Sequence, residues 1–189
     1  MKLFISLLLM ISFYSFAKDD HHNHDHSHNH TKEKNSKKDK KSLDAHLHGV
    51  SVLNLVQDMK QLSFEFEMPG FDVVGFEYKA KKKEDIKKVR NALSILGDYK
   101  NMIYVPASAS CKEEKNSAKV INEGSHSEFI GQYLLICEKI SAIKSIEIKF
   151  FDSFQFSKEL NINLIAKNKK ITQTINKQDN IINVDGYFN

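Results

Sequence analysis

Residues 49–68, GVSVLNLVQDMKQLSFEFEM, contain two strand-like runs on either side of the short polar break QDMK. In the second run the apolar side chains alternate with polar ones, at Leu62, Phe64, Phe66 and Met68. That period of two is typical of a strand with one buried and one wet face. The break is short enough for a hairpin turn, so the segment predicts two antiparallel strands.

The next patterned segment is KKKEDIKKVRNALSILG, residues 81–97, which follows the Pro69-Gly70 stop of the second strand. Its apolar residues fall three and four positions apart, at Ile86, Val89, Leu93 and Leu96. Gly97 stands where a helix end favours a positive φ. The spacing predicts an amphipathic helix over this range.

In the rest of the domain, apolar and polar residues alternate in short runs. Strands are predicted at 133–137, 145–151, 160–164 and 171–175, with a turn at 168–170. A hairpin, one helix and a series of strands predict the α+β class, with a mostly antiparallel sheet and one main amphipathic helix packed on one face.

The N-terminal residues 1–17, MKLFISLLLMISFYSFA, have the form of a signal peptide, with one Lys, an apolar run and the small-x-small end Ser15-Phe16-Ala17. A buried N-terminal helix is the alternative, but charged sequence follows at once. Residues 18–42 contain no aliphatic or aromatic residue, which predicts a disordered His/Lys-rich tail. Residues 43–189 then form the metal-binding domain, and no membrane span is expected in the mature chain.

Two cysteines, Cys111 and Cys137, follow the leader. An even number in an exported chain predicts a disulfide, which would stabilise the fold by about 3 kcal/mol through loop closure. A thiolate metal pair is the alternative, although no CxxC spacing supports it. The net charge of +4 is modest and argues against a nucleic-acid partner.

The tail contains the tract HHNHDHSHNH, which holds six of the nine histidines, at His21, His22, His24, His26, His28 and His30. Neutral imidazoles bind borderline cations, so the tract predicts capture of Zn(II), with Cu(II) or Ni(II) as alternatives. A flexible chain can bring two or three rings to one ion at about 2.0 Å. An engineered tag, a merely solvated tail and a pH sensor are the competing interpretations.

The three remaining histidines lie in two short motifs of the domain, AHLHG and HSEF. Side chains two residues apart in an extended chain point to the same side, so His46 with His48, and His126 with Glu128, form two ligand pairs. Together they would offer three nitrogens and a carboxylate, a suitable set for zinc. Surface or turn positions are the alternative for such histidines.

Several of these motifs resemble a family of zinc-regulated periplasmic zinc-binding proteins of Gram-negative bacteria. The likeness extends over residues 44–189 and rests on His46, His48, Gly49, the Pro69 turn, Gly75-Phe76-Glu77, Cys111, His126, Glu128, Phe129, Tyr133 and Cys137. The resemblance implies a periplasmic protein made under zinc scarcity that binds zinc through histidines and assists a high-affinity zinc importer. It implies no enzymatic activity.

Two positions depart from the family pattern. Tyr78 stands where the family has a His closing GFEH, so a ligand role there is lost or taken over by Glu77. The His-rich tract lies at the mature N-terminus here, whereas the family carries it just ahead of the HSEF-like motif.

The function expected from these observations is capture of Zn(II) by the tail and the domain histidines, in support of zinc uptake. A protein-interaction module for a metal importer, with metal binding only in the tail, is the first alternative. A zinc-dependent hydrolase is the second, but the sequence has no HExxH, GxSxG or other catalytic signature.

Overall fold

The computed structural model of the chain describes residues 47–167 and 169–188. The predicted leader 1–17, the tail 18–42 with its six histidines, and His46 therefore lie outside the described residues. Within the described part no helix is long and apolar enough to cross a membrane.

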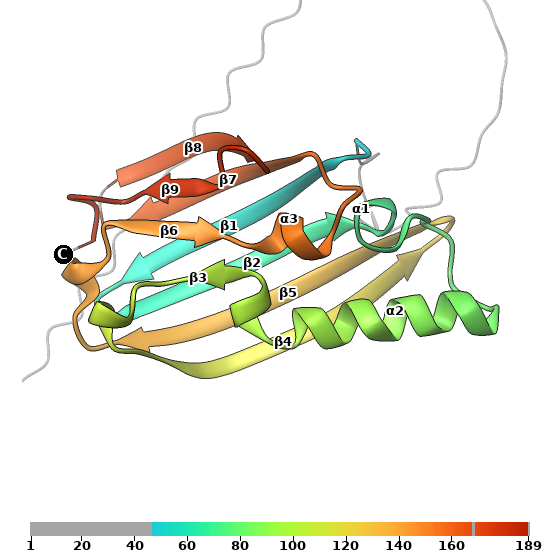
Figure 1. Ribbon diagram of the computed structural model, residues 1–189, viewed down its shortest axis with the longest axis horizontal. Coiled ribbons are helices and arrows are strands. Elements are labelled where there is room, and N and C mark those ends of the chain that lie inside the picture. The colour runs from blue at the N-terminus through green and yellow to red at the C-terminus, as the bar shows by residue number, and fades with distance from the viewer. Residues whose placement is uncertain (1–46, 168, 189) are drawn as a thin grey trace, which may run out of the picture. The chain divides into compact units, whose positions relative to one another are not determined.

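The elements follow one another along the chain as Figure 1 labels them. The strands are β1 Val50–Asp58, β2 Gln61–Pro69, β3 Ile103–Tyr104, β4 Cys111–Glu123, β5 His126–Cys137, β6 Ser145–Ile148, β7 Glu159–Ala166, β8 Lys169–Asn176 and β9 Ile181–Asn183. The helices are α1 Gly70–Val74, α2 Lys83–Leu96 and α3 Phe150–Ser153, and short 3-10 turns occur at Tyr99–Asn101, Ala107–Ala109 and Ile140–Ala142.

The opening hairpin is present. β1 and β2 pair antiparallel with Asp58 opposite Gln61, and Met59 takes a positive φ in the tight turn between them. The alternating apolar residues of β2 all point to the buried face, as the period of two requires. Each fully buried Phe or Leu of this hairpin contributes roughly 1.5 to 3 kcal/mol relative to an exposed one.

The hairpin lies in the middle of a six-stranded sheet whose order is β4-β5-β2-β1-β7-β8. Neighbouring strands run antiparallel except β1 and β7, which are parallel. A second sheet of three short strands has the order β3-β6-β9. The parallel pair is possible because a long crossover, containing all the described helices and the strands β3 and β6 of the small sheet, separates β1 from β7 in the chain.

The predicted α+β class, with a mostly antiparallel sheet and one main amphipathic helix, is wrong. Strands make up 48% of the described residues and helical segments 23%, and the large sheet is mixed. A helix does form at 83–96, close to the predicted range, but it is one of several short helical segments beside a dominant sheet. Alternation reveals that a segment is a strand and cannot reveal the direction of its partner, which depends on the crossover.

The alternation of apolar and polar residues also fails to predict the longest described strand, β4. It carries almost only exposed side chains, because it is an edge strand with polar residues on both faces. Charged residues are common on such edges, where they discourage pairing with other chains. Without a buried face the sequence shows no alternation, so the period gives no signal there.

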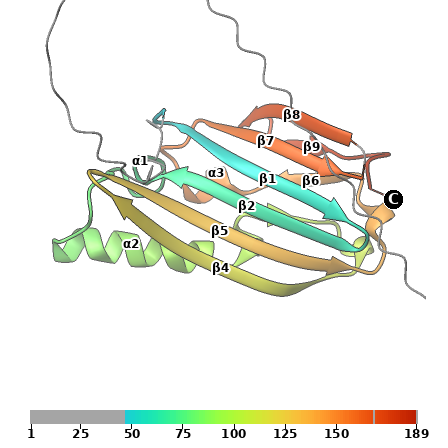
Figure 2. The ribbon, with the colours of Figure 1, turned by 180° about the vertical axis from the view of Figure 1, so that it is seen from behind.

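The core lies between the two sheets and the helices. The helices and the small sheet occupy one face of the six-stranded sheet, and no described element covers its other face (Figures 1 and 2). The largest fully buried side chains are aromatic, and they come from both layers: Phe64, Phe66, Phe129, Phe150 and Phe154. Several of these rings contact one another at tilted angles.

The predicted disulfide between Cys111 and Cys137 is confirmed. The two residues face each other where β4 begins and β5 ends, with Cα atoms 3.9 Å apart. The bridge fastens the edge strand to its neighbour at one end of the sheet.

Candidate metal centre

Three of the four described residues of the predicted metal site, His48, Glu77 and His126, meet at the end of the sheet where β1 begins and β2 ends. The turn before β1 carries His48, and Gly49 adopts a φ of +90° there, which a residue with a side chain rarely tolerates. At the same end α1 stops at Gly75, in the left-handed conformation, and the chain turns back with Glu77. β5 starts nearby with His126.

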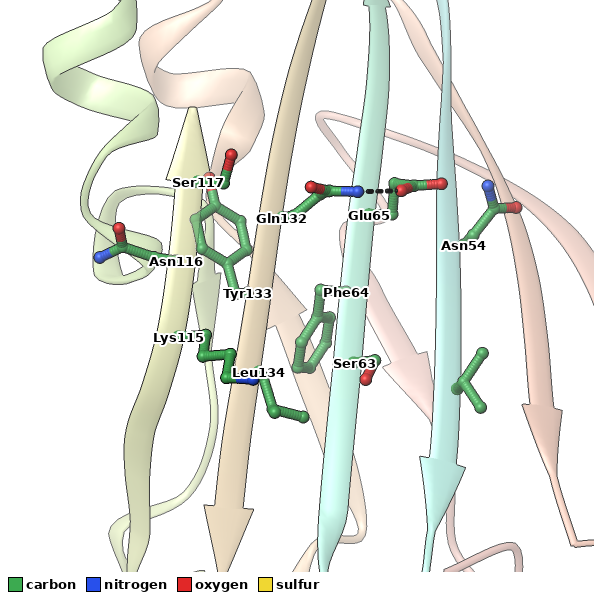
Figure 3. A pocket seen from close by; sticks show the side chains of 11 residues that line it. Asn54, Ser63, Phe64, Glu65, Lys115, Asn116, Ser117, Gln132, Tyr133 and Leu134 are labelled. Atoms are coloured by element: carbon green, nitrogen blue, oxygen red, sulfur yellow. Dashed lines mark hydrogen bonds between the residues drawn. The ribbon is translucent and has the colours of Figure 1, made fainter. Parts of the chain in front are cut away.

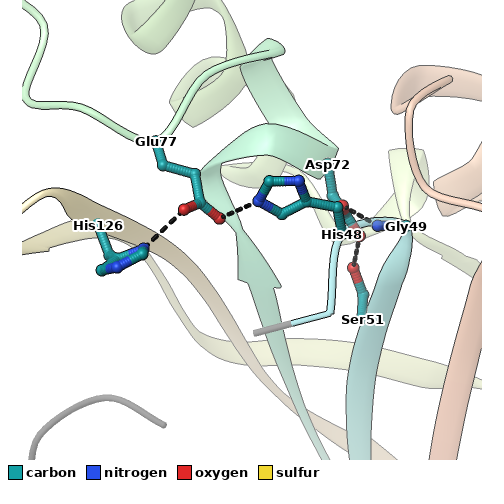
Figure 4. Close-up of polar contacts among 6 residues, drawn as sticks. All are labelled: His48, Gly49, Ser51, Asp72, Glu77 and His126. Carbon is teal, nitrogen blue, oxygen red and sulfur yellow. Dashed lines mark hydrogen bonds and ion pairs between the residues drawn. The ribbon is translucent and has the colours of Figure 1, made fainter. Parts of the chain in front are cut away.

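Glu77 lies between the two histidines (Figure 4). Its Oε2 is 2.6 Å from Nδ1 of His126, and its Oε1 is 3.1 Å from Nε2 of His48. The carboxylate side chain is 13% exposed, whereas the rings are 52% exposed at His48 and 47% at His126. One nearly buried carboxylate therefore connects two accessible imidazoles from different parts of the chain.

The two oxygens of Glu77 are not equivalent. Oε2 is hydrogen-bonded to His126. Oε1 is fully buried and has no hydrogen-bond partner in the described part, because the approach of His48 meets an ion-pair distance but not hydrogen-bond geometry. A buried carboxylate oxygen without a hydrogen bond costs free energy.

Helix α1 holds His48 in place through two consecutive residues. The ring of Phe71 stacks on the imidazole, with centroids 4.5 Å apart and planes 10° from parallel. Asp72 accepts a 2.7 Å hydrogen bond from the backbone N–H of Gly49, next to His48. The imidazole and its backbone are thus both fixed by one short helix, which reduces the freedom that ion binding would have to remove.

Asp72 is itself completely buried. Its second oxygen accepts a 2.9 Å hydrogen bond from Oγ of Ser51, which lies 3.3 Å from Oγ of Ser157. Burial raises the pKa of the Asp72 carboxyl, and the hydrogen bonds from Gly49 and Ser51 partly oppose the rise. The alternating pattern of the sequence gives no signal for this network, because its members come from three distant segments.

The predicted ligand set is therefore rearranged. The structure brings together His48, His126 and Glu77, but the carboxylate between the rings is Glu77 and not Glu128. Glu128 is buried in β5 opposite Pro69. The pKa of the Glu67 carboxyl is raised first by its own burial and then by the nearby charge of Glu128. The hydroxyl of Tyr78, at the position where the family has a histidine, donates to Asp85 and points to α2.

The donor chemistry fits zinc, although the described side chains do not converge on one point. Two imidazoles and a carboxylate are the nitrogen and oxygen ligands that Zn²⁺ takes. Among the described residues no three His, Cys, Asp or Glu side chains are arranged to hold an ion as they stand. Two ligands of one tetrahedral ion, each at about 2.0 Å, lie about 3.3 Å apart. The 3.1 Å between Nε2 of His48 and Oε1 of Glu77 is already close to that separation.

A hollow of about 480 Å³ lies elsewhere, on the face of the six-stranded sheet that points away from the helices (Figure 3). Its walls are mostly amide, hydroxyl and aliphatic side chains, and Gln132 donates a hydrogen bond to Glu65 across it. It contains no histidine. Metal chemistry therefore places the candidate site at Glu77 and not in this hollow.

The chain was compared with protein-family models and with curated proteins. Residues 45–184 match the family model described as ZrgA family zinc uptake protein. The search of curated proteins found no match. The matched range includes His46, His48, Glu77, Cys111, His126 and Cys137, the residues on which the likeness to a zinc-binding family rests. Since the match covers most of the chain, this protein belongs to the ZrgA family of zinc uptake proteins.

Proposed function

We propose that this protein captures Zn²⁺ outside the cytoplasm and supplies it for uptake, through a domain site at His48, Glu77 and His126 and through the histidines of the tail. Membership of a zinc uptake family supports the role in general terms. The observation that carries the specific proposal is the carboxylate of Glu77 between two exposed imidazoles, with its Oε1 buried and unbonded.

In this proposal zinc supplies what Oε1 of Glu77 lacks. An ion bound beside Nε2 of His48 gives the buried oxygen a positive partner and removes the cost of an unbonded carboxylate oxygen. Nδ1 of His126 reaches the other oxygen and completes the set of described donors. His46, the first histidine of the AHLHG motif, is the proposed fourth ligand.

The tail has a different role. Its six histidines offer many weak donor combinations, because a segment without apolar residues must lose chain freedom at each binding event. Such a tract suits collection of scarce ions at moderate affinity, and the domain site suits retention. Export to the periplasm, which the leader 1–17 and the family resemblance support, would put both in the compartment from which zinc is imported.

The proposed activity is binding and not catalysis. The sequence carries no nucleophile, base and metal signature of a known hydrolase class. The carboxylate of Glu77 lies nearly buried between two imidazoles, which suits holding an ion, whereas activation of water needs an open coordination position on the metal. A component of a zinc importer that accepts the ion is the proposed partner.

Isothermal titration with zinc tests the two sites separately. The processed protein should bind several ions, and a version in which the six tail histidines are changed to Asn should keep one tight site. Changing His48 and His126 to Ala, with the tail intact, should remove that tight site. If this variant keeps all tight binding, the domain site is refuted and the protein is better explained as an interaction module that binds metal only in its tail.

A further inference from the structure

Residues 79–90, the segment that leads into α2 and its first two turns, hold a dense positive charge. They contain seven basic residues and two acids, a net of +5, although the whole chain carries only +4. All seven basic side chains are exposed: Lys79, Lys81, Lys82, Lys83, Lys87, Lys88 and Arg90. Of the acids, Asp85 is buried and bonded to Tyr78, so only Glu84 is exposed. We call the seven basic residues the basic face.

The basic face does not stabilise the helix that carries it. Positive charge at a helix N-terminus opposes the helix dipole, and Lys82, at the N-cap, makes no capping hydrogen bond. Within the described chain none of the seven forms an ion pair with an acidic side chain. Lys88 has one partner, the ring of Phe76, at 5.9 Å. The charge is therefore available to something outside the domain.

Apolar hollows flank the basic face on both sides of α2. One, of about 250 Å³, is lined by Ile86 and Arg90 together with Tyr78. The other, of about 350 Å³, is lined by Lys88 together with Phe156. Tyr78 and Phe156 are each 51% exposed, which is high for aromatic side chains of this size. An exposed aromatic ring thus lies beside basic side chains in each of the two hollows.

We propose that the basic face docks on an anionic phospholipid bilayer, an interaction beyond zinc binding. Clusters of lysine on and beside a helix are attracted to negatively charged headgroups. Tyr prefers the headgroup level of a bilayer, and exposed Phe supplies apolar contact just below it. An acidic protein would be a weaker match, because protein interfaces favour Arg and are depleted in Lys. Six of the seven cations are Lys. Docking would hold the zinc-binding end of the sheet close to the membrane through which zinc is taken up.

Vesicle flotation with the protein as cells process it tests the proposal, using phosphatidylcholine alone or mixed with phosphatidylglycerol. Replacing Lys83→Gln and Lys87→Gln removes two charges from the middle of the basic face. The matched control, Lys170→Gln and Lys177→Gln, removes two exposed charges from β8 and its end, at the opposite edge of the sheet. The first variant should lose about tenfold or more in partition onto the mixed vesicles, and the control less than about twofold.

A second measurement locates the contact, because the tail is also rich in lysine. Mixed vesicles should protect Lys83 and Lys87 from acetylation and leave Lys170 reactive. Equal partition of the two variants, or protection confined to the lysines of residues 18–41, would overturn the proposal. So would binding to soluble polyglutamate without binding to vesicles, which would identify an acidic polypeptide as the partner.

Discussion

Nδ1 of His126 lies 2.6 Å from Oε2 of Glu77, although the two residues are 49 positions apart in the chain. The contact joins the start of β5 to the segment after α1, and the same carboxylate reaches His48 at the start of β1. The charged group that unites the two histidine motifs is thus one that neither motif contains.

Replacing Glu77→Ala should therefore weaken zinc binding more than an average surface change. Loss of a ligand or of its supporting carboxylate costs about 10- to 100-fold in metal affinity. The zinc affinity of Glu77→Gln should lie between that of Glu77→Ala and that of the wild type, because the amide keeps one oxygen but no charge. Zinc titration of both variants measures the effect, and Glu138→Ala, at an exposed carboxylate, is the control. Unchanged affinity in Glu77→Ala would remove Glu77 from the site.

Asp72 should matter for stability through the turn that carries His48. Changing Asp72→Ala leaves the N–H of Gly49 without its acceptor, which should cost about 1 to 3 kcal/mol of unfolding free energy. Asp72→Asn keeps an acceptor oxygen and should cost less. Urea unfolding, followed by circular dichroism, measures both. Equal effects of the two changes would mean that the buried charge, and not the hydrogen bond, determines the stability.

The buried carboxyl of Asp72 also predicts a pH dependence with a definite sign. Burial raises its pKa in the folded protein above the ordinary 3.8, so the folded state binds the proton more tightly than the unfolded state. The stability that this proton contributes is fully present below pH 3.8 and is lost as the pH rises through the folded pKa. The difference in unfolding free energy between the wild type and Asp72→Asn should therefore fall with rising pH and then level off. A difference that increases with pH would mean that the hydrogen bonds outweigh burial.

The disulfide should be important for the edge of the sheet. Cys111 and Cys137 close a loop with a sequence separation of 26, which on the chain-entropy model stabilises the folded state by about 3 kcal/mol. The double change to Ala should lower the urea midpoint accordingly and leave the zinc affinity of the domain unchanged, because the site lies at the far end of β5. A loss of zinc binding with retained fold would show that β4 and the site are coupled.

Residue patterns along the chain report which side chains are buried, and they do not report which distant segments meet. Alternation in β2 and the three-and-four spacing in α2 reported which residues are buried, because burial on one face follows directly from the period of the element. The same patterns missed β4, where both faces are polar, and the parallel pairing of β1 with β7. They also favoured Glu128 over Glu77, because sequence spacing shows only neighbours along one strand.

The sequence by itself determined the hairpin, the helix, the disulfide partners and the family, since these depend on local period, residue type or motif. Only the tertiary structure decided the mixed sheet, the carboxylate that lies between His48 and His126, and the buried Asp72 that fixes the turn of His48. The physical reason is that each of these is a contact between segments distant in the chain. Their meeting depends on the path of the whole backbone and not on the chemistry of any one segment.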